Sequence, residues 1–297
     1  MRVIYGWTLF SIAIVGFMVG GVFFALLLGG ACFMAGKEYI TIAQAKGIRP
    51  SVRVVLGMMI AFFVVAALPA IPGLNLSWNF SLEHFPIVLT VGMCFAFFRL
   101  LFRNEHPPAT MADIATTILG FIYVGWMPAH LVLLRNICPP GFEKETNPLL
   151  QPGVAYVWAS LFIVWATDVF AYYVGKKFGK HLLFPQISPK KTIEGAIGGL
   201  IAAVIFASLV VYLSDYWLFP NHPFRYNLWQ APLMGAVVSV ACQLGDLCES
   251  LLKRDAGLKD SGSIIPGHGG FLDRGDSLIF GGAISYYWIC LVVLGLL

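Results

Sequence analysis

The chain has 297 residues, of which 59% are hydrophobic and 11% are charged, and its formal net charge is +4. A mean hydropathy of +0.81 excludes an ordinary water-soluble domain. The apolar runs are long and continuous and do not alternate with polar residues, so they predict membrane-spanning helices instead of a β-barrel. The six cysteines show no paired spacing, which argues against both a disulfide framework and a zinc site.

Eight apolar runs approach the ~20 residues that a helix needs to cross a bilayer. They cover residues 7–36, 54–72, 86–103, 111–134, 153–175, 193–214, 229–250 and 277–297. The first run is too long for one upright helix, because about 30 residues make a helix of roughly 45 Å. It forms either one tilted helix or two short helices that turn near Gly20-Gly21 or Gly29-Gly30. The expected fold is an all-α polytopic membrane protein with eight or nine transmembrane helices.

Lysine and arginine are concentrated in alternate connections between the apolar runs. The rich connections are residues 37–53, 99–110, 175–192 and 251–276, and the connections between them hold few basic residues. By the positive-inside rule the rich set faces the cytosol. Arg2 favours the same side, which supports a hairpin in the first run and nine spans.

The most polar part of the chain is the glycine-rich stretch from Ser250 to Ser277, between the last two apolar runs. Its acids, bases and glycines suit a phosphorylated substrate that is held with a metal ion. Four residues around its start share one helical face because they are spaced i, i+3, i+4 and i+7: Asp246, Glu249, Ser250 and Lys253. Asp273 and Asp276 are three residues apart where the last helix is expected to begin, so they also share a face.

Three carboxylates, those of Asp246, Asp273 and Asp276, therefore lie at two helix ends near one leaflet. Such oxygen ligands suit Mg²⁺, which proteins commonly hold with one or two carboxylates plus substrate phosphates. Structural alternatives stay open: Asp273 or Asp276 caps the last helix, and Asp246 pairs with Lys253 or Arg254. For Asp246 a functional role is favoured, because an acid inside an apolar span is costly.

The most basic connection runs from Gly175 to Gly195. Ser188-Pro189 predicts a helix start, with the serine as N-cap and the proline in the first turn. The next three residues would then lie at the positive end of a helix dipole, where free backbone N–H groups bind phosphate: Lys190, Lys191 and Thr192. The alternative is that the lysines only fix the topology or touch anionic lipid.

Two further polar residues are candidates for function. Asp168 lies inside an apolar span, about two turns from its cytosolic end, and an acid in this place is a functional candidate; a structural pair with a lysine of a neighbouring helix is the alternative. His268 follows Gly267 and precedes two glycines, so it is a general base, a phosphate donor or a loop residue that serves only the fold.

The stretch from Ser250 to Asp276 closely resembles the signature of the phosphatidate cytidylyltransferase, or CDP-diacylglycerol synthase, family. The matching residues are Ser250, Lys253, Arg254, Lys259, Asp260, Pro266, His268, Gly269, Gly270, Asp273, Arg274 and Asp276. Two upstream runs also resemble motifs of this family: Ser188-Pro189-Lys190-Lys191-Thr192 with Glu194-Gly195, and Gln243-x-Gly245-Asp246-x-x-Glu249-Ser250. Gly275 and Ile193 depart from the family pattern without removing a reactive group. The resemblance covers roughly the C-terminal half, and residues 1–150 match only as apolar spans.

The resemblance implies the reaction CTP + phosphatidate → CDP-diacylglycerol + pyrophosphate. It implies that Asp246 and Asp273 are the metal ligands, for Mg²⁺ and a second cation such as K⁺. Together with the residue chemistry it predicts the catalytic residues Lys253, Arg254, Lys259, Asp260, His268, Arg274 and Asp276. The predicted substrate-binding residues are Ser188, Lys190, Lys191, Thr192, Ser250 and Asp168.

The expected partners are CTP, phosphatidate and the lipid bilayer, without nucleic acid, and a homodimer is left open. The expected location is a bacterial inner membrane with a cytosolic-side active site. The chain divides into N-terminal helices over 1–110, middle helices and the basic loop over 111–192, and a catalytic region over 193–297. Two other functions stay open: a CTP-dependent polyprenol or phytol kinase, and a transporter of an anionic solute built around Asp168.

Overall fold

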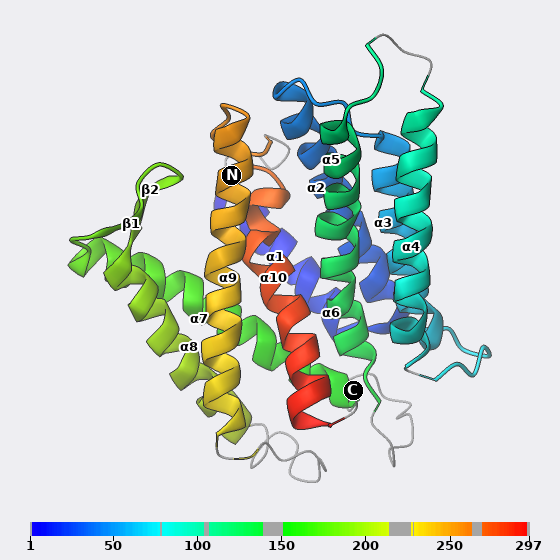
Figure 1. Cartoon of the computed structure of the whole chain (residues 1–297). Helices are drawn as coiled ribbons and strands as arrows, with labels where there is room; N and C mark the ends of the chain where they lie inside the picture. Colours follow the sequence, from blue (N-terminus) through cyan, green and yellow to red (C-terminus); the bar gives the residue numbers. More distant parts are fainter. Residues whose placement is uncertain are drawn as a thin grey trace. The chain divides into compact units, whose positions relative to one another are not determined.

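In the computed structural model the described residues are 2–77, 79–103, 107–138, 151–213, 227, 229–262 and 269–295, with the backbone alone for residues 2–10. These residues form helices and one short hairpin (Figure 1). The elements are α1 (Arg2–Val19), α2 (Gly21–Ala45), α3 (Val52–Ala67), η1 (Leu68–Ala70), α4 (Phe80–Leu101), α5 (Met111–Phe121), η2 (Ile122–Trp126), α6 (Met127–Asn136), α7 (Pro152–Phe178), β1 (Leu182–Phe184), β2 (Ser188–Thr192), α8 (Ile193–Leu213), α9 (Gln230–Asp255), α10 (Leu272–Trp288) and η5 (Ile289–Val293).

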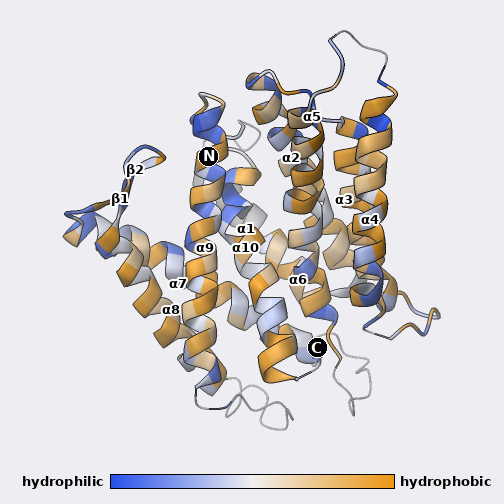
Figure 2. Ribbon diagram, in the orientation of Figure 1, coloured by the Kyte–Doolittle hydropathy of each residue, from blue (hydrophilic) through white to orange (hydrophobic). Residues whose placement is uncertain are grey.

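Eight helical stretches of the described residues are long and apolar enough to span a membrane. They follow the order of the eight predicted apolar runs, and α1 precedes them. Figure 2 shows the helices mostly in the orange of apolar residues, whereas blue marks much of the β1–β2 hairpin. The prediction of an all-α polytopic membrane protein is confirmed.

The first apolar run is two helices that turn at Gly20-Gly21. Gly20 has φ +68° and ψ −155°, a conformation that is essentially restricted to glycine. The fully buried Arg135 closes the turn, because its Nε donates to the Phe17 carbonyl (2.9 Å) and its Nη2 to the Met18 carbonyl (3.1 Å). The second helix continues to Ala45, well past the predicted end of the run at residue 36.

The chain forms two compact units, each built from two segments. Unit 1 consists of Met1–Asn136 and Leu252–Gly275, and unit 2 consists of Ile137–Leu251 and Asp276–Leu297. Both α9 and α10 pass from one unit into the other.

Three basic connections meet at one end of unit 1. The backbone N–H of Arg49, after α2, donates to Asp113 Oδ1 at the start of α5 (2.6 Å), and Arg103, after α4, donates to the Arg49 carbonyl (2.8 Å). Lys46 pairs with Asp255, at the end of α9, at 2.8 Å. This grouping agrees with the charge pattern of the sequence, and the cytosolic orientation itself stays a prediction.

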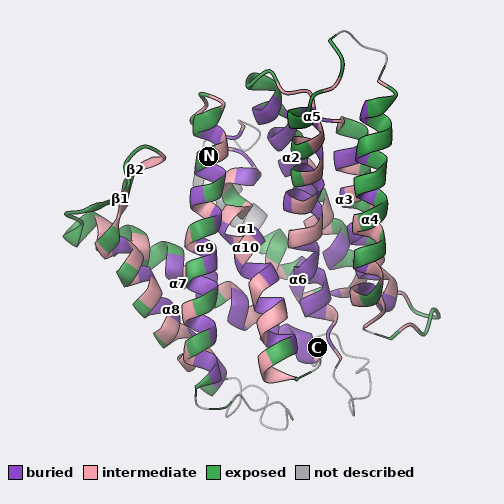
Figure 3. Cartoon of the chain, viewed as in Figure 1, coloured by how far each residue is buried: buried purple, intermediate pink, exposed green. Residues whose placement is uncertain are grey.

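The core of unit 1 lies around α3 and the continuous helix α5–η2–α6. Phe62 of α3 is fully buried, and its ring lies 5.3 Å from that of Phe85 and 6.4 Å from that of Phe121. The α6 part of the continuous helix is also inaccessible to solvent, and Figure 3 shows it almost entirely in the purple of buried residues. This packing fixes α2 and α5, which carry the buried acids of the unit.

Unit 2 places four helices close together through small residues. A Cβ on Gly199 of α8 would lie 2.8 Å from the Thr167 carbonyl of α7. A Cβ on Gly235 of α9 would lie 2.6 Å from the Ala203 carbonyl of α8, and one on Gly245 would lie 2.7 Å from the Asp276 carbonyl of α10. The polar residues of α7, α9 and α10 are thereby brought near one another.

The predicted helix start at Ser188 is wrong. Ser188–Thr192 is strand β2, which pairs antiparallel with β1, and α8 begins only at Ile193. Thr192 takes the capping role, because its Oγ1 accepts the Gly195 N–H at 3.1 Å. Pro189 is compatible with a strand that has one partner, since such an edge strand can do without an N–H donor.

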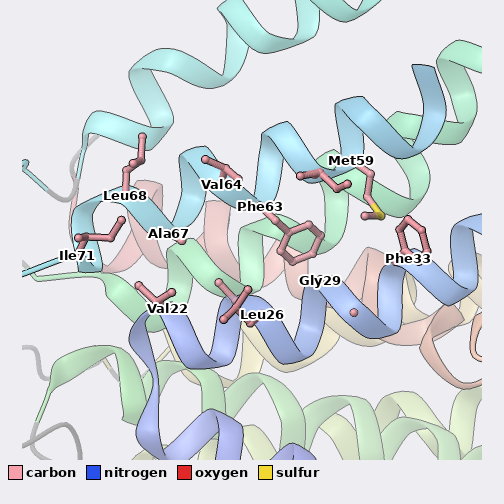
Figure 4. A pocket seen from close by; sticks show the side chains of 13 residues that line it. Val22, Leu26, Gly29, Phe33, Met59, Phe63, Val64, Ala67, Leu68 and Ile71 are labelled. Atoms are coloured by element: carbon pink, nitrogen blue, oxygen red, sulfur yellow. The ribbon is translucent and has the colours of Figure 1, made fainter. Parts of the chain in front are cut away.

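An apolar pocket of about 410 Å³ lies between α2 and α3 (Figure 4). Its lining includes Leu26 and Phe33 of α2 and Met59 and Phe63 of α3. Its lining residues are apolar or glycine, and none of them is a predicted site residue.

Candidate active site

The acids of unit 2 gather where α7, α9 and α10 pack together. Asp276 lies within electrostatic range of Asp246, Glu249 and Asp168. Ser277 Oγ donates to Asp168 Oδ1 at 3.1 Å, so the start of α10 holds the α7 acid directly. Asp276 is the fifth residue of α10, and its Oδ1 accepts the N–H of Ser277 at 2.7 Å. Of the three carboxylates predicted to converge, Asp246 and Asp276 lie near each other in unit 2, together with Asp168, and Asp273 belongs to unit 1.

Lys191 connects the hairpin to this acid group. Its Nζ lies 2.7 Å from Asp246 Oδ2, with side-chain exposures of 27% and 34%, so the pair is partly shielded from solvent. Asp246 therefore pairs with Lys191, which was not among the partners, Lys253 and Arg254, that the sequence left open for it. Lys190, the neighbour of Lys191 on β2, is exposed.

The base of the hairpin is fixed by Glu194. Its carboxylate accepts the backbone N–H groups of Lys180 (3.1 Å) and His181 (3.2 Å), and lies 2.6 Å from the His181 ring nitrogen Nδ1. The sequence analysis assigned no role to His181. These bonds tie the residues after α7 to the start of α8 and so place β2 and Lys191.

In unit 1 a second lysine–carboxylate pair lies at the ends of α9 and α10. Lys253 Nζ is 2.5 Å from Asp273 Oδ1, and the two side chains are only 11% and 12% exposed. Asp273 Oδ2 accepts the backbone N–H of Ser261 (3.0 Å) and of Gly270 (2.9 Å). Asp273 thus joins the two ends of the loop that precedes α10, which is part of the capping role left open by the sequence.

The end of α9 is defined by Gly257, whose φ is +70°. The N–H of Leu258 bonds to the Lys253 carbonyl (2.8 Å) and that of Gly257 to the Arg254 carbonyl (3.0 Å), which is a Schellman motif. Arg254 Nη1 also donates to the Leu258 carbonyl at 2.9 Å. The turn therefore sets where Lys253 lies on the last turn of the helix.

The other predicted residues fall into three groups. Ser250 is buried on α9, and Ser188 and Thr192 are half-buried at the two ends of β2. The charged residues on the surface are Lys259, Asp260 and Arg274. His268 lies outside the described residues.

Glu38 is a residue of this region that the sequence analysis missed. It lies on α2 with 4% exposure, and its carboxylate contacts Ser261, Phe271 and Leu272. The signal was present: Glu38 is followed by Tyr39, Ile40 and Ile42, which continue the apolar face of a helix. The predicted apolar run ends at residue 36, so Glu38 falls in the basic connection 37–53, whereas in the structure it lies on α2.

The donor set fits a magnesium ion in its chemistry. Asp246, which has Asp168 and Asp276 near it in unit 2, and Asp273 of unit 1 each supply hard carboxylate oxygens, and Mg²⁺ needs one or two of these when substrate phosphates supply the rest. Among the described residues no group of three or more histidine, cysteine or acidic side chains already forms a metal cage. Such a site would therefore depend on phosphate oxygens from the substrate.

Comparison with known proteins identifies the family. A sequence model of the cytidylyltransferase family matches residues 1–292. The chain belongs to this family. The match extends the resemblance beyond the C-terminal half and includes the helices of unit 1 that precede the motifs.

Relatives of this cytidylyltransferase-family chain carry the name phosphatidate cytidylyltransferase. The protein from Synechocystis sp. is 32% identical over 292 residues, which cover 93% of this chain and 91% of the relative. The protein from Bacillus subtilis is 34% identical over 239 residues, covering 76% of this chain and 80% of the relative. One from Staphylococcus aureus is 48% identical over 139 residues, or 47% and 49% of the two chains.

Proposed function

We propose that this protein transfers the cytidylyl group of CTP to phosphatidate and so makes CDP-diacylglycerol for phospholipid biosynthesis. The family and the names of its relatives support this reaction. The observation that carries it is the pair of lysine–carboxylate contacts, Lys191–Asp246 and Lys253–Asp273. In each contact, a lysine of the kind that binds phosphate lies beside a carboxylate of the kind that binds a metal ion.

The chemistry is a displacement at the α-phosphorus of CTP. An oxygen of the lipid phosphate forms a bond to this phosphorus, the bond from the phosphorus to the bridging oxygen of the β-phosphate breaks, and pyrophosphate leaves. No covalent intermediate with the protein is needed, so positioning and charge neutralisation provide the rate enhancement.

Asp246 and Asp273 would hold Mg²⁺, with a second cation such as K⁺ as part of the proposal. The bound ion would neutralise charge on the triphosphate. Lysine binds phosphate as a point charge, which suits Lys191 and Lys253, whereas Arg254 and Arg274 offer a planar fork. Ser188, Thr192 and Ser250 would donate hydrogen bonds, and exposed Lys190 and Lys259 would contribute charge.

The proposed orientation places this chemistry on the cytosolic side of a bacterial inner membrane. The supply of CTP in the cytosol and the basic connections at one end of unit 1 support this side. The phosphate of a membrane-resident lipid already lies at headgroup depth, so phosphatidate would reach the site from within the bilayer.

One labelling experiment tests the proposal against the two other functions. Membranes that contain the chain are incubated with phosphatidate, Mg²⁺ and CTP labelled either at the α-phosphate or at the γ-phosphate. We expect label in lipid from the α-position only, and none in membranes that lack the chain. Lipid labelled from the γ-position alone would identify a kinase, and uptake of an anion without labelled lipid would identify a transporter.

A further inference from the structure

Glu38 is a buried acid in an apolar helix to which the proposed reaction assigns no role. Its Oε1 accepts the N–H of Phe271 at 3.0 Å, and its Oε2 accepts the N–H of Leu272 at 2.8 Å and the hydroxyl of Ser261 at 3.0 Å. A carboxylate in this environment is costly unless it is fully hydrogen-bonded. These three hydrogen bonds offset the cost of burying the Glu38 carboxylate. All of the residues that form them belong to unit 1.

The bonds of Glu38 lead directly to Asp273. Phe271 and Leu272 are the residues where α10 begins, and their N–H groups have no acceptor within the helix. Ser261 Oγ, which Glu38 binds, also lies 3.3 Å from the N–H of Asp273, and the Ser261 N–H donates to Asp273 Oδ2. Glu38 therefore fixes both the helix start and the serine that orient the Asp273 carboxylate.

Glycines at positions 262 and 270 leave room for the Glu38 carboxylate. A Cβ on Gly262 would lie 2.6 Å from Glu38 Oε1, and a Cβ on Gly270 would meet Glu38 Oε2 and Ser261 Oγ at still shorter range. A side chain at either position would displace the acid. The two glycines thus provide the space that the Glu38 carboxylate occupies.

We propose that Glu38 is a positioning residue that holds Asp273 in the orientation required for cytidylyl transfer. It does so by capping α10 from a different helix and by binding Ser261. This inference rests on the proposed function, in which Asp273 contacts the cation on the triphosphate. Glu38 itself touches no substrate in this account.

The test uses Glu38→Gln in the chain, with Asp113→Asn as a matched control. Asp113 is also a buried acid of unit 1, with 2% exposure, and it caps α5 while accepting the Arg49 N–H. Its carboxylate accepts the N–H groups of Thr110 and Arg49, neither of which belongs to the loop before α10. We expect Glu38→Gln to lower kcat at least tenfold while KM for CTP changes less than threefold, and Asp113→Asn to keep kcat within threefold.

A second readout does not depend on activity. Hydrogen–deuterium exchange of the amides at residues 270–273 should become at least tenfold faster in Glu38→Gln and stay within threefold in Asp113→Asn. Unchanged kcat or unchanged exchange in Glu38→Gln would overturn the inference. So would equal effects from Asp113→Asn, because the loss would then reflect general stability.

Two outcomes require a further measurement. If Glu38→Gln cannot be purified, Ser261→Ala decides, since it removes only the hydroxyl between Glu38 and Asp273: a fall in kcat with faster exchange supports the inference, and wild-type values overturn it. If the wild-type protein makes no cytidine-labelled lipid, the proposed function fails. The exchange measurement then decides by itself whether Glu38 holds the loop.

Discussion

Two lysine–carboxylate pairs dominate the chemistry at the residue scale. Lys253 and Asp273 are nearly enclosed, whereas Lys191 and Asp246 are each about one third exposed. Removing one partner of an enclosed pair leaves a charge without compensation, which is more costly than the pair itself is favourable. The two pairs therefore have similar chemistry but different consequences for stability.

Asp273→Asn should remove activity and also weaken the fold. We expect cytidylyl transfer to fall about 100-fold or more, and the free energy of unfolding to fall by about 3 kcal/mol because the nearly enclosed ion pair of Lys253 with Asp273 is lost. Asp246→Asn should remove activity equally with a smaller loss of stability. Transfer assays and thermal unfolding in detergent measure both; normal turnover in either variant would contradict the metal assignment.

Lys190 and Lys191 should separate in kinetics although they are neighbours in sequence. Lys191→Gln is expected to lower kcat/KM at least tenfold, about 1.4 kcal/mol of transition-state stabilisation, because Lys191 pairs with Asp246 whereas Lys190 is exposed. Lys190→Gln should cost less than threefold, and Lys191→Arg should keep part of the activity. Lys177→Gln serves as the control for charge alone. Equal losses at 190 and 191 would favour a diffuse electrostatic role.

At the scale of elements, apolar periodicity predicted the spans well, and local polar signals were less reliable. The eight spans and the start of α10 near Asp273 follow from hydrophobic length and charge, which the bilayer enforces. The helix predicted at Ser188 fails because the pairing of β2 with β1 and the bonds of Glu194 override a local capping signal. The partners of Glu38 could not be predicted because they lie more than 220 residues away in sequence.

The turn between α1 and α2 gives a prediction that separates two glycines. Gly20→Ala should destabilise the protein by about 2 kcal/mol or more, because alanine rarely adopts this conformation and its Cβ would lie 2.5 Å from the Arg135 guanidinium. Gly30→Ala is the matched control: it lies within α2 with open space around it, and alanine favours a helix. Thermal unfolding measures both. A tolerated Gly20→Ala would argue against this turn.

At the scale of the whole molecule, the alternation of basic connections sets the orientation in the membrane. Single cysteines at exposed Gln44 and Lys180, in a background without the six native cysteines, should be protected from an impermeant thiol reagent in intact cells. A cysteine at exposed Ser77, at the other end of α3 from Gln44, should react and serves as the positive control. Labelling of Lys180→Cys but not Gln44→Cys would place the two connections on opposite sides of the membrane.

The reach of Glu38 from α2 to the loop before α10 has a consequence for engineering. The recognisable motifs lie in the second half of the sequence, which invites the view that the first half is an exchangeable membrane anchor. A fragment or chimera that replaces α2 would leave the N–H groups of Phe271 and Leu272 without their acceptor. Domain swaps among relatives should therefore transfer α2 together with residues 261–273 as one module.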